Sequence, residues 1–360
     1  MGIVTERKIF EYIRNIYAPQ DYPALADELD KWRRSRPFAG AKLLDATPVF
    51  TNTLVKYMPL LAGGATLSVG IGEHTPYDPK LLPLLREWGL RVLAPAECSD
   101  GEFDVVMDCA GMFSGLRARC GYVELTRSGL YSYRGVNAPV FFADAGKIKL
   151  IETTLGTGDG YCRALEHLGY DLGGKRLLVF GGGKVGRGIA MHSNRAGARV
   201  CIADFEPRKL PKIEGVGALD AGNESEVAAA IRKADFVVSA TGVEGALAGH
   251  AKVLLESSAV IANMGVLDEF GADLPAERVL NAKRPLNFIL DEPTRLKYID
   301  PTMALDNAGA LEVLSGRVER GVADPPAELE KEILDAVRRS GAIGEELNWI
   351  GDDNHEVDFH

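Results

Sequence analysis

Residues 175–207 read KRLLVFGGGKVGRGIAMHSNRAGARVCIADFEP, and this stretch decides the fold. The apolar run 176–180 predicts a strand, and it leads into the spacing Gly181-x-Gly183-x-x-Gly186 at the start of a predicted helix. A turn of this kind brings backbone N–H groups against a pyrophosphate. Asp204 ends the next predicted strand, 18 residues beyond Gly186. A carboxylate there holds the ribose hydroxyls of a dinucleotide.

The position of Asp204 favours NAD as the cofactor, because the carboxylate would repel the 2′-phosphate of NADP. Arg208 and Lys209 follow closely and leave NADP open. S-adenosylmethionine, bound by a transferase, can use a similar turn. Two later strand ends, SATG and NMG, are expected to border the nicotinamide half. The predicted cofactor contacts of this region are Gly181, Gly183, Lys184, Val185, Gly186, Asp204, Thr241, Gly242, Asn263 and Met264.

Short apolar runs alternate with helical patterns on both sides of this stretch. Runs such as FDVVMD and VFFAD are apolar on both faces, as strands covered by helices on each side must be. The chain is therefore expected to be α/β, with a doubly wound parallel Rossmann domain (157–294) inserted into a second α/β substrate domain (1–156 and 295–360). Predicted strands are 42–44, 66–71, 91–94, 104–108, 122–125, 139–143, 176–180, 199–205, 235–240, 259–263 and, less regularly, 288–290.

Composition excludes several classes of function. The net charge is −10 and the pI near 5.3, so a nucleic acid would be repelled. No apolar run approaches the ~20 residues of a membrane span, and the N-terminus lacks the apolar core of a signal peptide. The five cysteines have neither CxxC pairing nor zinc spacing, so no metal is expected and a reducing compartment is indicated. We expect a cytoplasmic protein that acts on a small molecule.

Six blocks of the sequence together resemble one family. The order GTGDG, GKRLLVFGGGKVGRGIA, ARVCIADFEP, FVVSATG, VIANMG and LDNAGAL resembles the S-adenosyl-L-homocysteine hydrolase (adenosylhomocysteinase) superfamily over about residues 139–311. The resemblance implies bound NAD, transient oxidation of a nucleoside 3′-hydroxyl, elimination and addition at C5′, and a homo-oligomer such as a homodimer. It also implies cofactor contacts at Thr126, Ser128, Thr157 and Asn307.

The chain departs from the family at positions that carry chemistry. Counted without gaps, the family's catalytic lysine position holds Ile148, and the Asp-Asn pair after it is Glu152-Thr153. The histidine after the third strand end is Val266, and the N-terminal histidine has no counterpart near residues 47–53. The family's C-terminal Lys and Tyr are missing from the tail GDDNHEVDFH. A relative with different chemistry is therefore expected.

Five residues are candidates for proton transfer. Glu152 keeps a carboxylate where the family has one, and a dry cleft between the domains would raise its pKa. Asp108 and Glu124 end predicted strands, and Glu124 precedes the expected nicotinamide contact. Lys149, with Lys147, flanks the lost lysine. His74 is the histidine that falls in a loop of the substrate half.

These observations predict an NAD-dependent enzyme, an oxidoreductase or an adenosylhomocysteinase-like hydrolase or lyase. It would act by hydride transfer, net or transient, on a small polar or nucleoside-like substrate in the interdomain cleft. Two alternatives stay open. One is a catalytically degraded sensor or scaffold that binds NAD or a nucleoside, and the other is an S-adenosylmethionine-using transferase on the same fold.

Overall fold

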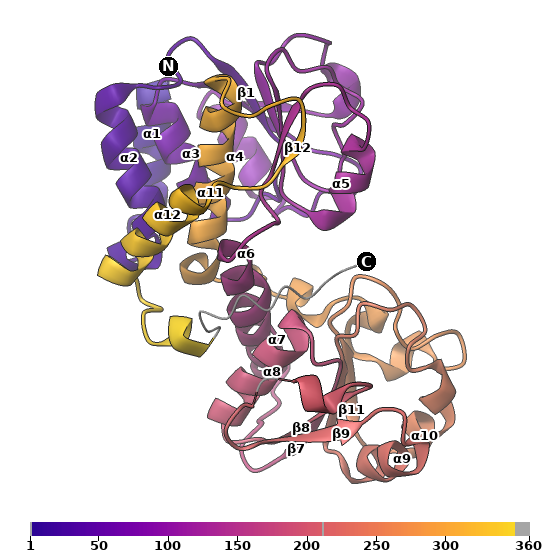
Figure 1. The fold of residues 1–360 in the computed structure, drawn as a ribbon. Helices are drawn as coiled ribbons and strands as arrows, with labels where there is room; N and C mark the ends of the chain where they lie inside the picture. The colour runs from indigo at the N-terminus through magenta and orange to yellow at the C-terminus, as the bar shows by residue number, and fades with distance from the viewer. Residues whose placement is uncertain (1, 211, 350–360) are drawn as a thin grey trace. The chain divides into compact units, whose positions relative to one another are not determined.

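The computed structural model describes residues 2–210 and 212–349. The tail GDDNHEVDFH, residues 351–360, lies outside the described residues. The chain forms two compact units, which Figure 1 shows in colours that run along the sequence. Unit 1 comprises Met1–Ile151 and Leu296–His360, and unit 2 comprises Glu152–Arg295. The sequence places its domain borders at 156/157 and 294/295.

Unit 1 contains a seven-stranded parallel sheet in the order β12-β6-β5-β4-β1-β2-β3. The central strands are buried on both faces, which explains their continuous apolar runs. The strands are β1 (Lys42–Asp45), β2 (Thr66–Gly70), β3 (Arg91–Leu93), β4 (Val105–Asp108), β5 (Gly121–Glu124), β6 (Pro139–Phe142) and β12 (Gly321–Ala323).

Helices cover both faces of this sheet. Figure 1 shows α1, α2, α3 and α11 together on one face and α5 on the other. All ten residues of α3 are buried, and α11 packs on α2, α3, α12 and three strands, so the last part of the chain completes the core of unit 1. The helices are α1 (Gly2–Ile13), α2 (Pro23–Ser35), α3 (Thr53–Ala62), α4 (Leu81–Glu87), α5 (Arg127–Tyr133), α6 (Ile148–Leu150), α11 (Leu296–Leu314) and α12 (Ala327–Ser340).

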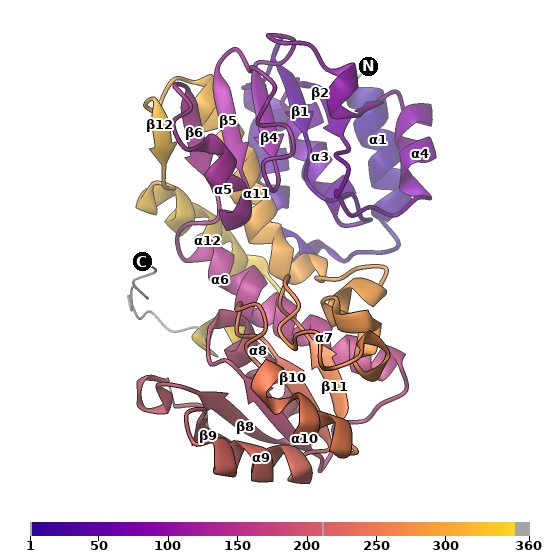
Figure 2. The ribbon, with the colours of Figure 1, turned by 90° about the vertical axis from the view of Figure 1, so that its right-hand side faces the viewer.

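Unit 2 is a five-stranded parallel sheet in the order β11-β10-β7-β8-β9, the strand order of a Rossmann fold. One apolar core lies against α7 and α8 and another against α9 and α10, and Figure 2 shows these pairs on opposite sides of the sheet. The elements are β7 (Arg176–Phe180), β8 (Arg199–Asp204), β9 (Val216–Asp220), β10 (Phe236–Ser239), β11 (Val260–Asn263), α7 (Thr157–His167), α8 (Lys184–Arg195), α9 (Glu224–Lys233) and α10 (Ala251–Glu256).

Three elements differ from the sequence prediction. The predicted strand at 288–290 is wrong, because Leu286–Ile289 forms a 3-10 turn. Strands β9 and β12 were not predicted, since both lie at sheet edges and their residues, exposed or half-buried, lack an apolar pattern. Residues Ile151–Gly156 form a π-helical turn that continues directly into α7. Such turns occur frequently at functional sites.

Candidate cofactor site and active site

The glycine loop between β7 and α8 has the shape that a dinucleotide requires. Gly181 has φ +93°, which glycine adopts without steric cost. A Cβ on Gly186 would overlap the carbonyl oxygen of Gly181, so the helix can start this close to the strand only with glycine. A Cβ on Gly183 would have no heavy atom within 4 Å. The N-terminus of α8 therefore faces open space, as a pyrophosphate site must.

Asp204 ends β8 beside this loop and is hydrogen-bonded to it. Its Oδ2 accepts a hydrogen bond from the N–H of Gly182 at 2.8 Å, and its Oδ1 accepts one from the N–H of Glu206 at 2.9 Å. The side chain is only half-buried. Each carboxylate oxygen can accept a second bond, so Asp204 is held in place with capacity left for ribose hydroxyls. The glycine loop and Asp204 thus fit the pyrophosphate and ribose of NAD.

The segment before α7 packs against the helix that follows the glycine loop. A Cβ on Gly188 would overlap the carbonyl oxygen of Thr154, and a Cβ on Gly158 would overlap the backbone of Gly188. The hydroxyl of Thr157 donates to the carbonyl oxygen of Glu152 at 3.3 Å. Glu152 and Thr157, both half-buried, therefore belong to a π-turn and helix start fixed within the nucleotide-binding unit.

The ends of β10 and β11 are organised by buried polar side chains. Asn263 is fully buried, and its amide donates to the carbonyl oxygens of Gly265, Leu267 and Lys283. Its position shapes the loop after β11. Met264 is buried in the core under α7 and α8, whereas Thr241 and Gly242 are held by Glu269, which sequence reasoning missed. The distance of 27 residues or more between Glu269 and its partners left no local signal.

In unit 1, carboxylates gather at one edge of the sheet. Asp45, Asp108 and Glu124 are the last residues of β1, β4 and β5, and Asp144 follows β6 by two positions. These four strands are adjacent and parallel, so their carboxyl ends meet at the same edge. Ligands of open α/β sheets bind at this edge. The structure thus brings three sequence candidates, Asp108, Glu124 and the nearby Lys149, to one end of the sheet.

Glu124 has an unusually polar and enclosed environment. Its carboxylate accepts hydrogen bonds from the N–H groups of Ala110 and Gly111, both at 3.1 Å, and from the N–H and hydroxyl of Thr126 at 2.8 and 2.6 Å. A Cβ on Gly129 would overlap the carboxylate. Burial nevertheless raises the pKa of Glu124 to about 7, and the bonds from Thr126 oppose this shift. Glu124 can therefore exchange a proton near neutral pH.

Asp108 is held more tightly by its surroundings. Its carboxylate accepts hydrogen bonds from the hydroxyl of Tyr133 at 2.6 Å and from the N–H groups of Phe113 and Cys109 at 2.9 and 2.8 Å. Burial raises the pKa of Asp108, and the hydrogen bond from Tyr133 lowers it. Burial also raises the pKa of the Cys109 thiol, which makes this cysteine a poor nucleophile. Asp108 mainly fixes the loop after β4.

The remaining candidates of unit 1 differ in exposure. Lys149 is buried, with its ammonium 3.5 Å from Asp144 Oδ1 and 3.3 Å from the carbonyl oxygen of Leu125. His74 is exposed in the loop after β2, and the adjacent Thr75 donates to the sulfur of Met112 in the loop after Asp108.

The two residues to which the resemblance assigns cofactor contacts, Thr126 and Ser128, lie just after β5. Thr126 caps α5 by accepting a hydrogen bond from the N–H of Gly129, and the hydroxyl of the exposed Ser128 lies 3.3 Å from the hydroxyl of Thr126.

Ile148, in the position of the family's lysine, is fully buried.

A buried cluster of charges in unit 1 was missed by sequence reasoning. Lys56 on α3 forms ion pairs with Asp45 and Asp306, and all three side chains are fully buried. Asn307 is also fully buried and donates to Glu28 Oε2 at 3.2 Å and to the carbonyl oxygen of Lys56 at 3.1 Å. The cofactor role that the resemblance implies for Asn307 therefore stays a prediction, while its amide links α11 to α2 and α3.

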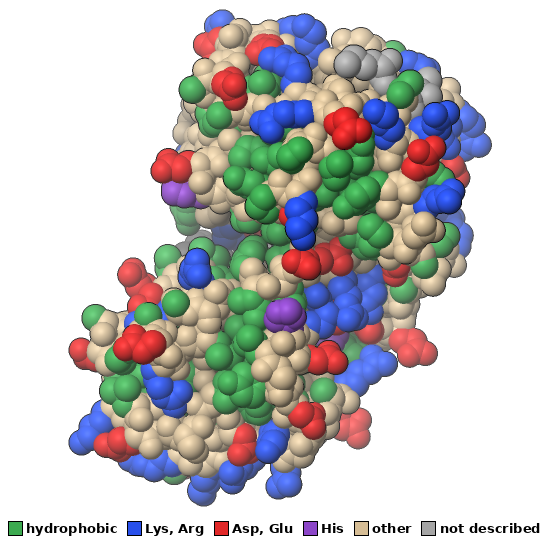
Figure 3. Space-filling view, turned by 180° about the vertical axis from the view of Figure 1, so that it is seen from behind, with side chains coloured by type: hydrophobic (Ala, Val, Ile, Leu, Met, Phe, Trp, Pro, Cys, Tyr) green, Lys and Arg blue, Asp and Glu red, His purple; other side chains and the backbone are tan. Residues whose placement is uncertain are grey.

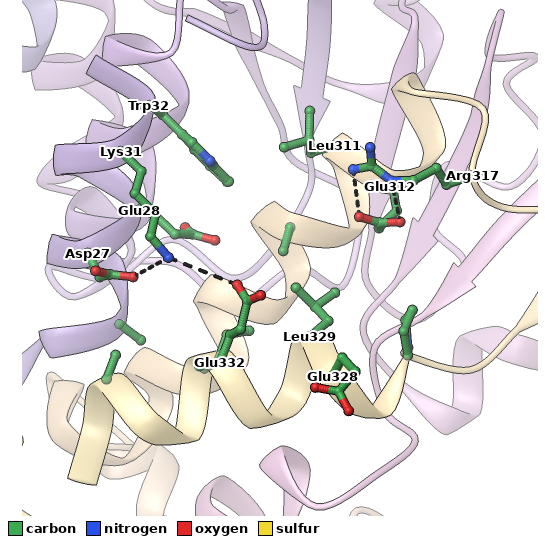
Figure 4. Close-up of a pocket in the computed structure, with 15 residues that line it drawn as sticks. Asp27, Glu28, Lys31, Trp32, Leu311, Glu312, Arg317, Glu328, Leu329 and Glu332 are labelled. Carbon is green, nitrogen blue, oxygen red and sulfur yellow. Dashed lines mark hydrogen bonds and ion pairs between the residues drawn. The ribbon is translucent and has the colours of Figure 1, made fainter. Parts of the chain in front are cut away.

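A pocket of about 380 Å³ lies among α2, α11 and α12 (Figure 4). Its charged side chains are largely engaged with one another. The ammonium of Lys31 lies 2.8 Å from Oδ2 of Asp27. Nε and Nη2 of Arg317 each donate a hydrogen bond to the carboxylate of Glu312. None of the predicted catalytic residues lines this pocket.

Surface charge, metal-ligand clusters and helix apolarity bear on which functions the described residues support. On the face drawn in Figure 3, Lys and Arg side chains are interspersed with Asp and Glu side chains in each unit. No cluster of His, Cys, Asp and Glu within residues 2–210 and 212–349 has the arrangement of a metal site. Over the same ranges, no helix has both the length and the apolarity to cross a bilayer.

Comparison with known proteins identifies the nucleotide-binding unit. The family described as "S-adenosyl-L-homocysteine hydrolase, NAD binding domain" matches residues 154–274. The adenosylhomocysteinase of Thermoplasma acidophilum is 25% identical over 295 residues, which are 73% of this chain and 70% of that protein. The nucleotide-binding unit is therefore similar to the NAD-binding domain of adenosylhomocysteinases. The chain is an NAD-dependent enzyme, either oxidoreductase-like or hydrolase-like, as the sequence predicts.

A further relative and one solved structure are also similar to this chain. The S-inosyl-L-homocysteine hydrolase of Methanosarcina mazei is 24% identical over 73% of this chain and 71% of its own length. Among solved structures, a dipicolinate synthase chain from Bacillus halodurans superposes with a TM-score of 0.53 at 14% identity, over 77% of this chain and 99% of that one. This last likeness concerns the two-unit α/β fold alone.

Proposed function

We propose that this protein oxidises an alcohol carbon of a small polar or nucleoside-like substrate, either as a net reaction or transiently to drive an elimination. The observation that carries the proposal is the open glycine turn over Gly183 with Asp204 fixed beside it. Relatives named adenosylhomocysteinase and S-inosyl-L-homocysteine hydrolase support a nucleoside joined to homocysteine as the substrate class. NAD, when bound, supplies the acceptor for a hydride.

The residues of unit 1 and of the π-turn have separate roles in this proposal. Glu152 accepts the proton of the alcohol as general base. Glu124, with a pKa of about 7, holds or releases a second proton near neutral pH. The buried ammonium of Lys149 provides positive charge for an oxyanion. Residues 157–294 would hold the cofactor and the flanking segments the substrate, in a homo-oligomer whose size light scattering would measure.

The test is to incubate the purified protein with S-adenosyl-L-homocysteine and, separately, with S-inosyl-L-homocysteine. Release of homocysteine is followed with a thiol reagent, and bound NADH by its absorbance near 340 nm. Thiol release without net NADH supports transient oxidation, and NADH that builds up with turnover supports net oxidation. Purified protein that binds neither NAD nor a nucleoside would contradict the proposal.

A second candidate function is a sensor that binds NAD or a nucleoside without turnover. Ile148 favours it, because a buried isoleucine cannot transfer protons where the superfamily has its lysine. A sensor would bind a nucleoside with measurable heat in calorimetry while neither thiol nor NADH appears over hours. The same titration with S-adenosylmethionine checks the transferase alternative. Turnover of any tested substrate would exclude the sensor.

A further inference from the structure

The carboxylate of Glu269 lies beneath the loop that follows β10. The hydroxyl of Ser239 donates to its Oε2, as do the N–H and the hydroxyl of Thr241, both at 2.8 Å. The N–H of Gly242 donates to Oε1 at 2.7 Å. The side chain is fully buried. Four donors of a single short segment therefore converge on one carboxylate, and the conformation of this loop depends on it.

The bonding pattern suits the ionised form of Glu269. Two of the donors, the N–H groups of Thr241 and Gly242, can only donate, and an ionised carboxylate is an acceptor only. Bonds of this kind to a carboxylate are short and strong. Lys283, whose ammonium binds the residue before Glu269, directs it to Asp268 Oδ2 at 2.9 Å and to the carbonyl oxygen of Gly271. Among residues 2–210 and 212–349, the groups bonded to the Glu269 carboxylate are N–H and hydroxyl dipoles rather than a cation.

The loop after β11 is built around this carboxylate. A Cβ on Gly265 would overlap Oε1 of Glu269, so only glycine lets the carboxylate reach β10. The backbone of the two loops is joined as well, since the N–H of Leu247 donates to the carbonyl oxygen of Glu269 at 2.8 Å. Asn263 holds Gly265 from the other side by accepting its N–H. The site is thus rigidly preorganised.

We propose that Glu269 is a positioning residue that fixes the cofactor loop Ser239–Gly242, and that its buried negative charge favours oxidised NAD⁺ over NADH. The inference rests on the proposed placement of the nicotinamide half at the end of β10. The nicotinamide ring is positively charged in NAD⁺ and neutral in NADH. A unit charge on the order of 10 Å away, at an effective dielectric constant of about 20, changes the preference by roughly tenfold or more.

The experiment measures the dissociation constants of NAD⁺ and of NADH separately, by isothermal titration calorimetry, for the wild type, Glu269→Gln and Ser239→Ala. Glu269→Gln removes the charge and should weaken NAD⁺ about tenfold more than NADH. Ser239→Ala removes one donor but keeps the charge, so it should change both constants by the same factor. Equal weakening of NAD⁺ and NADH in Glu269→Gln would overturn the electrostatic role.

Glu269→Asp covers the case in which the glutamine variant does not fold. It keeps the charge but withdraws the carboxylate by one methylene, so both affinities should fall in parallel. Unchanged affinities for both cofactor forms would overturn the positioning role. Wild-type protein that binds neither form would contradict the proposed cofactor site itself, whereas binding of both forms with a constant ratio in all variants contradicts only the electrostatic role of Glu269.

Discussion

The ammonium of Lys56 lies 2.6 Å from Oδ2 of Asp306, and neither side chain is exposed to solvent. Asp45 binds the same ammonium from the end of β1. Burial raises the pKa of Asp306, and Lys56 opposes that shift. One lysine thus compensates two carboxylates contributed by β1 and α11.

Replacing Lys56 should therefore be costly. We expect Lys56→Met to lower the free energy of unfolding by about 3–5 kcal/mol, because it leaves two buried carboxylates without a cation. Urea denaturation followed by circular dichroism measures the change. Lys31→Met is the matched control, since Lys31 is half-exposed and its ion pair with Asp27 is worth at most about 1 kcal/mol. Equal effects of both variants would contradict the expectation.

The stability of unit 1 should depend on pH through Asp300. This carboxylate of α11 accepts hydrogen bonds from the N–H groups of Ala24 and Leu25 at the start of α2, both at 2.9 Å. Burial raises its pKa to about 7, above the roughly 3.9 of an unfolded chain. The folded state then binds the proton more tightly, so the contribution of Asp300 is complete below about pH 4 and is lost as the pH rises to about 7.

Denaturation midpoints between pH 4 and 8 measure this dependence. The slope due to Asp300 is at most roughly 1.4 kcal/mol per pH unit. Asp300→Asn should remove that part of the slope, while Asp30→Asn, on the exposed side of α2, should leave it unchanged. A slope that persists in Asp300→Asn would assign the dependence to another group.

The close approach of α7 and α8 can be tested at Gly188. Gly188→Ala places a methyl group on the carbonyl oxygen of Thr154, and we expect a loss of about 1–3 kcal/mol from overpacking. Gly249→Ala, where the new Cβ has no heavy atom within 4 Å, should change stability by less than about 0.5 kcal/mol. Thermal unfolding of both variants measures these changes in stability. An unchanged stability in Gly188→Ala would show that the helices can move apart to accept the methyl group.

Cofactor affinity should depend on Asp204. Asp204→Ala removes a carboxylate from the end of β8 and should weaken NAD binding by about 1.5–3 kcal/mol, the scale of hydrogen bonds to charged groups. Asp220→Ala, at the end of the neighbouring edge strand β9, is the control and should bind NAD normally. Calorimetric titration measures both. Unchanged affinity in Asp204→Ala would remove the ribose contact from this position.

Turnover should depend on Glu152. Glu152→Gln keeps the shape of the side chain and removes the base, so we expect NAD to stay bound while kcat falls by at least about 10²-fold. Glu166→Gln, at an exposed position of α7, is the matched control. The assay is release of thiol or formation of NADH with whichever of S-adenosyl-L-homocysteine and S-inosyl-L-homocysteine the wild type turns over. Normal turnover in Glu152→Gln would direct attention to Glu124, whose replacement would be tested next.

The sequence alone determined the features of this protein that depend on short-range order. The glycine spacing 181–186 is a local requirement of a turn with φ +93° at Gly181 and a helix packed against its strand. Apolar runs such as 105–107 predict strands buried on both faces, because no other arrangement removes both faces from water. The acidic residues that end β4 and β5, Asp108 and Glu124, are therefore predictable from the sequence.

Only the tertiary structure decided which polar groups meet. Asn307 binds Glu28 across 279 positions of sequence, and Asp300 binds Leu25 across 275. Glu269 and Lys56 have no motif that marks them, because their partners are brought together by the sheets and by α11. Burial, which comes from the whole fold, raises the pKa of Glu124 to about 7, and the sequence carries no local signal of burial.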